Sequence, residues 1–184
     1  MAIEKYTTKA IVIEGYDQSE NDKAFKIFTR EFGMIICHAK SIRKLESKLR
    51  AHILPRGMST LTLVKGKEVW RLVGADVEEC SSSRIHEVTA ILSRFIRGEG
   101  AHKALFDRIT SLLSHKGIYD ISITRLLLYY IMLVELGYAD AKVIGARDIK
   151  EYIHFSIDEL YTHILLTKPQ VTSHVKEVLK EMQL

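Results

Sequence analysis

The first 80 residues consist largely of short β-branched and apolar segments separated by turn residues, and this density of strand signals constrains the fold most strongly. Within residues 24–30, side chains alternate between two faces, as in a half-buried strand. Connections such as Glu31-Phe32-Gly33 and Lys65-Gly66-Lys67 are short. Strands are predicted at residues 7–14, 24–30, 34–39, 49–54, 59–64 and 68–77. So many short strands with little helix predict a small barrel or sandwich.

The hydrophobic period changes near residue 80, where Cys80-Ser81-Ser82-Ser83 precedes a 3.6-residue apolar repeat. The repeat starts at Val88 and predicts an amphipathic helix that Gly98 closes. Polar residues of the serine run are typical of a helix start. The chain is therefore predicted as an α+β protein with a strand domain at residues 1–80 and a helical domain at residues 81–184.

Four further helices are expected in the second part of the chain. Residues 101–115 form an amphipathic pattern, whereas residues 120–136 are apolar on nearly all sides and predict a central, buried helix capped by Gly137. Capping-box spacings that begin at Ser156 and Thr167 predict two shorter helices after them.

The composition excludes several classes of protein. The N-terminal residues 1–9 are polar and unlike a secretory leader, and the longest apolar run, residues 126–136, is too short to cross a bilayer. We therefore expect a soluble cytoplasmic protein without a membrane partner. Cys37 and Cys80 are too few for a disulfide framework or a cysteine zinc site, and both are expected to be buried or half-buried thiols.

No motif predicts catalysis. Gly98-Glu99-Gly100 is a weak match to a phosphate-binding glycine loop, and His102 with Asp107 does not supply a set of metal ligands. The acidic residues between Asp17 and Asp22 fit a polar loop better than a two-metal site. We expect no enzyme activity, no catalytic residue, no metal and no cofactor.

Positive charge is concentrated in one segment. Residues 40–71 contain nine basic and two acidic side chains, a net +7, although the whole chain carries only +4. Five of the cations lie between Lys40 and Arg50 around Glu46, on an expected loop where they could neutralise several phosphates. Tyr16, Phe28 or Trp70 could add base stacking, although packing in the core is the favoured role for each. The alternative for the cations is a solvated charged face.

Several segments together resemble the bacterial recombination mediator family RecO. The most specific is Ala39-Lys40-Ser41-Ile42-Arg43-Lys44 followed by Ser47-Lys48-Leu49-Arg50, which is similar to a basic Ala-Lys-Gly-x-Arg and Ser-x-Leu-Arg stretch of that family. The resemblance covers about residues 6–140. Its other segments are residues 8–13, 19–23, 28–33 and 94–96, and Leu133-Val134-Glu135-Leu136-Gly137-Tyr138.

The resemblance implies an N-terminal OB-type β-barrel that binds single- and double-stranded DNA. It further implies that the protein anneals complementary strands and helps to load RecA. The implied protein partners are RecR and the C-terminal tail of single-stranded-DNA-binding protein. Many relatives carry a four-cysteine zinc module after the long helix, but residues 139–155 contain no cysteine, so a zinc-free, shortened variant is expected. By position, the expected DNA contacts are Lys9, Lys40, Arg43, Lys44, Lys48 and Arg50, with Lys23, Arg30 and Arg56 as weaker additions.

Two other functions remain open at this point. The same fold could act as a protein-interaction adaptor that binds an acidic peptide tail and no DNA. It could also be an OB-type RNA-binding factor, which a preference for strands with 2′-hydroxyl groups would reveal.

Overall fold

A computed structural model describes residues 4–67, 69–78, 84–115 and 120–183. The chain divides into two compact units, residues 1–106 and 107–184, and the division falls within helix α2 (Lys103–Ser114). Strands end at Glu78 and the first helix, α1 (Ile85–Phe95), begins at Ile85, so the change in period near residue 80 marks the change in secondary structure. The first compact unit nevertheless extends to Phe106, because α1 contacts β1 and Phe106 packs on Phe28.

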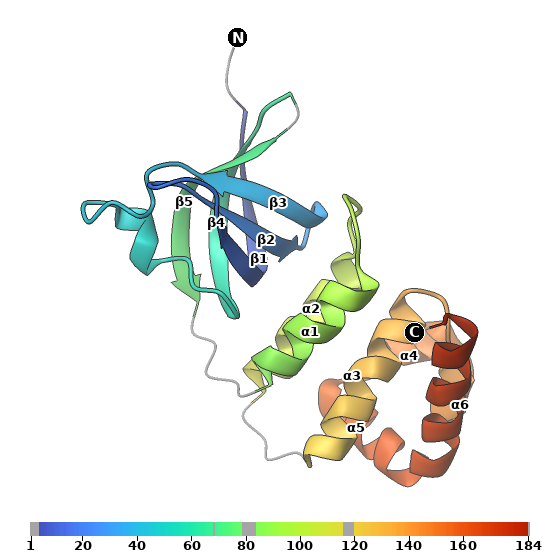
Figure 1. The fold of residues 1–184 in the computed structure, drawn as a ribbon. Coiled ribbons are helices and arrows are strands. Elements are labelled where there is room, and N and C mark those ends of the chain that lie inside the picture. Colours follow the sequence, from blue (N-terminus) through green and yellow to red (C-terminus); the bar gives the residue numbers. More distant parts are fainter. Residues whose placement is uncertain (1–3, 68, 79–83, 116–119, 184) are drawn as a thin grey trace. The chain divides into compact units, whose positions relative to one another are not determined.

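The first unit contains a closed barrel, which confirms the predicted OB-type fold. Its strands follow the order β1-β2-β3-β5-β4, and β4 returns to pair with β1 (Figure 1). All neighbours are antiparallel except β3 and β5, which pair in parallel at only two positions, Cys37 with Trp70 and His38 with Arg71. The strands are β1 (Lys5–Asp17), β2 (Lys23–Thr29), β3 (Gly33–Ala39), β4 (Gly57–Lys65) and β5 (Trp70–Glu78).

The barrel core follows from strand alternation. On β2, Phe25 and Ile27 point into the barrel, and they pack with Val12, Leu61 and other inward side chains. Phe28 lies on the opposite face of the strand, yet it is also fully buried, because its ring packs 5.6 Å from that of Phe106. Both faces of this part of the sheet are therefore covered, and Phe28 has the packing role that the sequence favoured.

One predicted strand is wrong. Residues 49–54 do not join the sheet; Lys48–Ala51 forms the 3₁₀ helix η1, and turns follow it. Ile53 is buried in the barrel core, whereas Leu54 on the next position is exposed, and this alternation imitates a strand. The five other strands already complete the ring, so this segment has no strand edge to pair with. The segment instead covers one end of the core.

A short segment after α1 closes on the turn between β2 and β3. Gly33 and Glu99 form an isolated antiparallel bridge, and Gly100 donates its backbone N–H to the Phe32 carbonyl at 3.1 Å. Gly33 has a φ of +71°, which favours glycine. The helix expected to close at Gly98 ends earlier, at Phe95, because residues 96–100 leave the helix to make these contacts.

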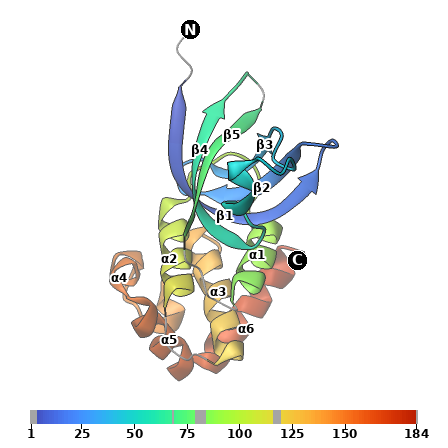
Figure 2. The same ribbon diagram turned by 90° about the vertical axis from the view of Figure 1, so that its left-hand side faces the viewer.

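The second unit is helical, as predicted. Its elements are the end of α2, then α3 (Ile121–Glu135), the 3₁₀ helix η2 (Ala141–Ile144), α4 (Ile149–His154), α5 (Ile157–Leu166) and α6 (Lys168–Glu181), which Figure 2 shows from a second side. Helix α3 contacts both α5 and α6 and is buried on most sides, in agreement with its apolar sequence. No helix among the described residues has both the length and the apolar character needed to cross a membrane.

Two of the predicted helix caps, at Gly137 and Ser156, are confirmed. Tyr138 donates to the Leu133 carbonyl at 2.7 Å and Gly137 donates to Val134 at 3.0 Å, a Schellman motif with Gly137 at φ +80°. Ser156 forms the expected capping box with Glu159. The serine run at residues 81–83 lies outside the described residues.

The capping box predicted at Thr167 is wrong. The Thr167 side chain makes no N-terminal cap; its hydroxyl donates backward to the His163 carbonyl at 2.7 Å. The reason is that α5 ends directly where α6 begins, so Thr167 also serves as the last residue of the preceding helix.

The buried thiol of Cys37 gives a first testable prediction; Cys80 lies outside the described residues. Burial raises the pKa of Cys37 from 9.0 to about 12. At pH 8, this thiol should therefore hold about a thousandfold less thiolate than an ordinary cysteine, and only the thiolate attacks disulfide reagents. In a Cys80→Ser variant, we expect negligible reaction with a chromogenic disulfide in the native state and a full equivalent in 6 M guanidinium. Rapid native reaction would show that the Cys37 side of the barrel opens.

Candidate nucleic-acid interface

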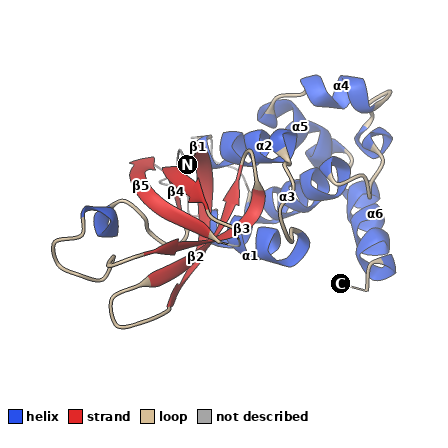
Figure 3. Ribbon diagram, turned by 90° about the horizontal axis from the view of Figure 1, so that it is seen from above, coloured by secondary structure: helices blue, strands red, loops and turns tan. Residues whose placement is uncertain are grey.

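The basic loop between β3 and β4 is held against the shorter loop between β1 and β2. Ser41, at φ +54°, donates its backbone N–H to the Asp22 carboxylate at 2.7 Å. Arg43 donates its backbone N–H to the Asn21 carbonyl at 3.0 Å and its guanidinium to the Ser19 carbonyl at 3.1 Å. The loop is the teal segment at the left of Figure 1, and in Figure 3 it is the tan loop that carries the short helix η1. The sequence predicts residues 41–48 as an exposed loop or short helical excursion, and the structure has turns over residues 41–46 with η1 starting at Lys48.

Three of the expected DNA contacts meet around one pocket. Lys23, Arg43 and Arg50 line a hollow of about 460 Å³ between the two loops. Its apolar lining comes from Phe25 and Ile42 of the barrel end and from residues 53–55. The pocket therefore combines a cationic rim with an apolar floor.

One acid also belongs to the pocket. The two carboxylate oxygens of Asp17 lie 3.3 Å from the Lys23 ammonium and 3.5 Å from the Arg43 guanidinium. These ion pairs are exposed, so they contribute little to stability. Their effect is to hold the two cations on one side of the hollow. The sequence places Asp17 in a polar loop but does not show that it faces these cations.

A second hollow, of about 330 Å³, lies on the other side of the β1–β2 loop. Lys40 and Arg71 line it together with His38, whose Nδ1 lies 2.7 Å from the Gln18 side-chain oxygen. Sequence reasoning missed Arg71 as a site residue. The parallel pairing of His38 with Arg71 brings it beside Lys40, and nothing in the local sequence shows that register.

Lys44 and Lys48 are exposed on the outer part of the same loop. Lys44 lies in a turn, where its backbone N–H donates to Ser41 at 3.2 Å, and Lys48 is the first residue of η1. The loop and the adjoining hollows thus gather seven cations: Lys23, Lys40, Arg43, Lys44, Lys48, Arg50 and Arg71. A surface of this kind attracts a polyanion.

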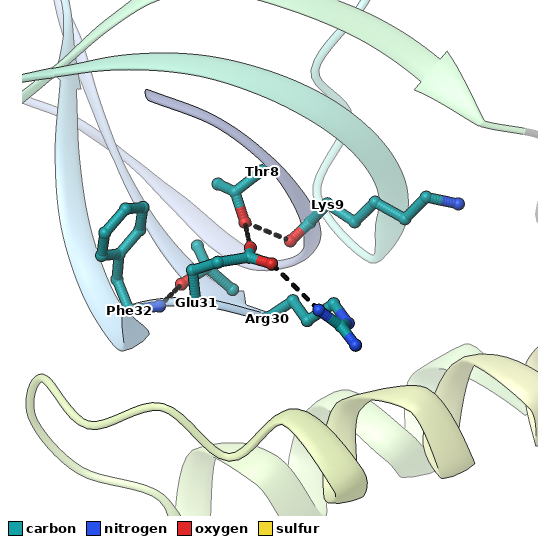
Figure 4. A network of polar contacts seen from close by, with 6 residues as sticks. Thr8, Lys9, Arg30, Glu31 and Phe32 are labelled. Carbon is teal, nitrogen blue, oxygen red and sulfur yellow. Dashed lines mark hydrogen bonds and ion pairs between the residues drawn. The ribbon is translucent and has the colours of Figure 1, made fainter. Parts of the chain in front are cut away.

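Lys9 and Arg30 do not join this group. They lie near the pair Ala10–Thr29, seven positions along β1 from the pair Asp17–Lys23, which corresponds to roughly 20 Å. Arg30 lies 3.3 Å from Glu31, which also accepts a hydrogen bond from the Thr8 hydroxyl (Figure 4). Lys9 lies 3.5 Å from Glu78, and its carbonyl accepts a hydrogen bond from the Arg30 backbone N–H at 3.2 Å. These two residues would need a ligand that spans the barrel.

Arg56 occupies a third position. It has a φ of +58°, which is uncommon for a residue with a side chain, and its backbone N–H donates to the Val12 carbonyl at 2.8 Å. Its side chain is exposed but does not line either hollow. Val12 precedes the pocket residue Asp17 by five positions on β1, so Arg56 lies between the two basic groups.

Of the three aromatic candidates, two are structural. Trp70 is buried against Tyr6 and Phe32, and its Nε1 donates to Glu99 at 3.0 Å. A hydrogen bond from Lys65, followed by that from Trp70, holds the pKa of Glu99 below its usual value. Phe28 is buried as described above. Only Tyr16, next to Asp17, is exposed, with 42% of its surface accessible.

The strand order defines the first unit as an OB-type barrel domain, and a cationic loop lies at one end of this barrel. Residues 1–81 match the family model described as "Recombination protein O N terminal". The N-terminal part of the chain is therefore similar to the N-terminal domain of the RecO family of DNA repair and recombination proteins.

Curated relatives agree with this similarity. They include proteins named "DNA repair protein RecO" from several strains of Dehalococcoides mccartyi. That of strain CBDB1 is 33% identical over 70 residues, 38% of this chain and 28% of the relative. That of strain 195 is 26% identical over 117 residues, 59% of this chain and 46% of the relative. The same name belongs to a Clostridium perfringens protein that is 39% identical over 62 residues, 34% of this chain and 25% of the relative. The chain therefore spans less than half the length of these relatives.

Proposed function

We propose that this protein is a non-enzymatic mediator of recombinational repair that binds DNA and promotes annealing of complementary strands. The observation that carries this proposal is the gathering of Lys23, Arg43 and Arg50 around one pocket of a barrel that is similar to the RecO N-terminal domain. Lys40 and Arg71 extend the cationic surface beside it. Such a surface holds two phosphate backbones near one another and offsets their mutual repulsion, and no covalent bond needs to change.

Partners follow from the similarity to the RecO family alone. RecR, RecA and the tail of single-stranded-DNA-binding protein are the proposed partners, and we assign no residue of the chain to them. Lys9, Arg30 and Arg56 are proposed as secondary contacts for a strand that continues along the barrel, because they lie apart from the two hollows.

The DNA-binding surface is tested by removing four loop cations together, Lys40→Ala, Arg43→Ala, Lys44→Ala and Lys48→Ala. Each lost phosphate contact should reduce the slope of log affinity against log salt by about 0.7 for a single strand, so the affinity should fall at least about tenfold near 0.1 M salt. The measurement is fluorescence anisotropy of a labelled oligonucleotide at several salt concentrations, followed by an annealing assay.

A matched control removes the same charge from the second unit. Lys142, Lys150, Lys168 and Lys176 are all exposed there, and their replacement by alanine should leave affinity within about twofold if the loop is the site. Equal losses in both variants would show a general charge effect and no specific surface. If the unmodified protein bound no oligonucleotide even at low salt, the proposed function itself would be wrong.

A further inference from the structure

We propose that the pocket between the two loops receives one unstacked base of a single DNA strand, while its rim holds the neighbouring phosphates. This inference rests on the proposed function and adds the kind of ligand that the pocket takes. It commits the site to single-stranded DNA, because a base within a duplex is stacked and paired and would first have to leave the helix.

The floor of the pocket has the chemistry of a base-binding surface. Phe25, Ile42 and Ile53 are buried in the barrel, and Leu54 and Pro55 continue the apolar surface toward solvent. Leu54 keeps 55% of its surface exposed and lines the pocket, so its side chain is accessible to a ligand there. The hollow of about 460 Å³ lies in the range of small-ligand sites, about 300–1,000 Å³. Because Phe25, Ile42 and Ile53 are buried, Leu54 and Pro55 supply the apolar surface that a ligand can reach, and a base has a face that can pack on them.

The rim has the chemistry of the sugar-phosphate backbone. Lys23, Arg43 and Arg50 come from β2, from the loop and from η1, and they meet only at this pocket. Asp17 lies between two of them, at 3.3 Å from Lys23 and 3.5 Å from Arg43. A carboxylate in this position can accept hydrogen bonds from the amino group of a base, while the cations bind the neighbouring phosphates.

Cations continue beyond the pocket. Lys40 and Arg71 line the neighbouring hollow, and the β1–β2 loop, which holds Asp22 against Ser41, separates the two hollows. A ligand with regularly repeated negative charge fits two such basic hollows in series. An acidic peptide fits less well, because its carboxylates would meet Asp17 and Asp22 on the same surface.

The test separates bases from phosphates. The probes are a labelled single strand and a strand of equal length in which tetrahydrofuran residues replace all nucleosides, so the charge is the same and the bases are absent. The variant is Leu54→Ser, and the control is Leu45→Ser, since Leu45 is 90% exposed on the same loop and does not line the pocket. We expect Leu54→Ser to weaken the ordinary strand about fivefold and to leave the abasic strand within error. Leu45→Ser should change neither.

The outcomes are distinct. If Leu54→Ser weakened both probes equally or neither, while salt-dependent binding of DNA persisted, the base pocket would be wrong and the proposed function would stand. If an acidic peptide that ends in phenylalanine lost affinity in the Leu54→Ser variant while the ordinary strand did not, the pocket would be a peptide site and the inference would be overturned. If neither probe bound the unmodified protein at low salt, the proposed function would fail together with this inference.

Discussion

Replacing Arg108 by methionine is expected to lower the free energy of unfolding of the second unit by about 3–5 kcal/mol, because this change leaves a buried carboxylate without its partner. The Arg108 side chain is 11% exposed and that of Glu135 is 10% exposed, with Nε and Oε1 2.8 Å apart. The guanidinium also donates to the carbonyls of Phe155 at 3.0 Å and Tyr152 at 2.7 Å, and it lies 4.4 Å from the centre of the Tyr152 ring. One side chain therefore joins α2, α3, α4 and the segment after α4.

The effect can be assigned to the ion pair with two further variants. Tyr152→Phe keeps the ring beneath the guanidinium and removes a buried hydroxyl that makes no hydrogen bond, so it should leave stability unchanged or slightly raised. The double variant Arg108→Met with Glu135→Leu should recover part of the loss, because no charge is then left buried. Urea unfolding followed by far-ultraviolet circular dichroism measures all three. A loss below 1 kcal/mol for Arg108→Met would show that the pair is open to solvent.

Replacing Gly33 by alanine is expected to destabilise the first unit by about 2–4 kcal/mol, because two penalties combine. The residue has a φ of +71°, where a side chain costs about 1–2 kcal/mol. A Cβ at this position would also lie only 2.1 Å from the Gly100 carbonyl oxygen, so the backbone of residues 98–100 must move. That movement would break the bridge to Glu99, and with it the hydrogen bonds of Glu99 to Lys65 and Trp70.

Gly98→Ala is the matched control for Gly33→Ala. Gly98 has a similar φ of +75°, but a Cβ there meets nothing within 4 Å, so only the conformational penalty applies. The difference between the two variants therefore measures the close contact with Gly100. Trp70 is the single tryptophan of the chain and lies in the first unit, so its fluorescence during unfolding reports on that unit. An equal loss of stability in the two variants would show that the close contact with Gly100 does not contribute.

Local sequence pattern predicted most helices and strands well, but it predicted residues 49–54 of the β3–β4 loop wrongly. The β-branched and apolar runs of the first 80 residues predicted five of the strands, and the 3.6-residue repeats predicted the long helices, because each pattern matches the repeat of one secondary structure. The strand prediction for residues 49–54 failed because an irregular segment that covers a core can also place Ile53 inward and Leu54 outward. Whether such a segment pairs depends on a free strand edge elsewhere in the chain.

The candidate site divides in the same way. The run from Lys40 to Arg50 is a local feature, and its position on an exposed loop could be predicted from composition alone. Three other features could not be predicted, because they depend on strand register. These are the association of the loop with Lys23 and Asp17, the proximity of Arg71 to Lys40, and the distance of Lys9 and Arg30 from the loop. A shift in register by one residue would turn each side chain to the other face.

By itself, the sequence determined the class of fold, the positions of the regular elements, and a basic loop that resembles a RecO segment, because propensity, period and charge act over a few residues. Only the tertiary structure decided which of those cations share a pocket, that its floor is apolar, and that Asp17 lies on its rim. The physical reason is ring closure. Contacts across the barrel join residues far apart in the chain, and their positions follow from the pairing of β1 with both β2 and β4.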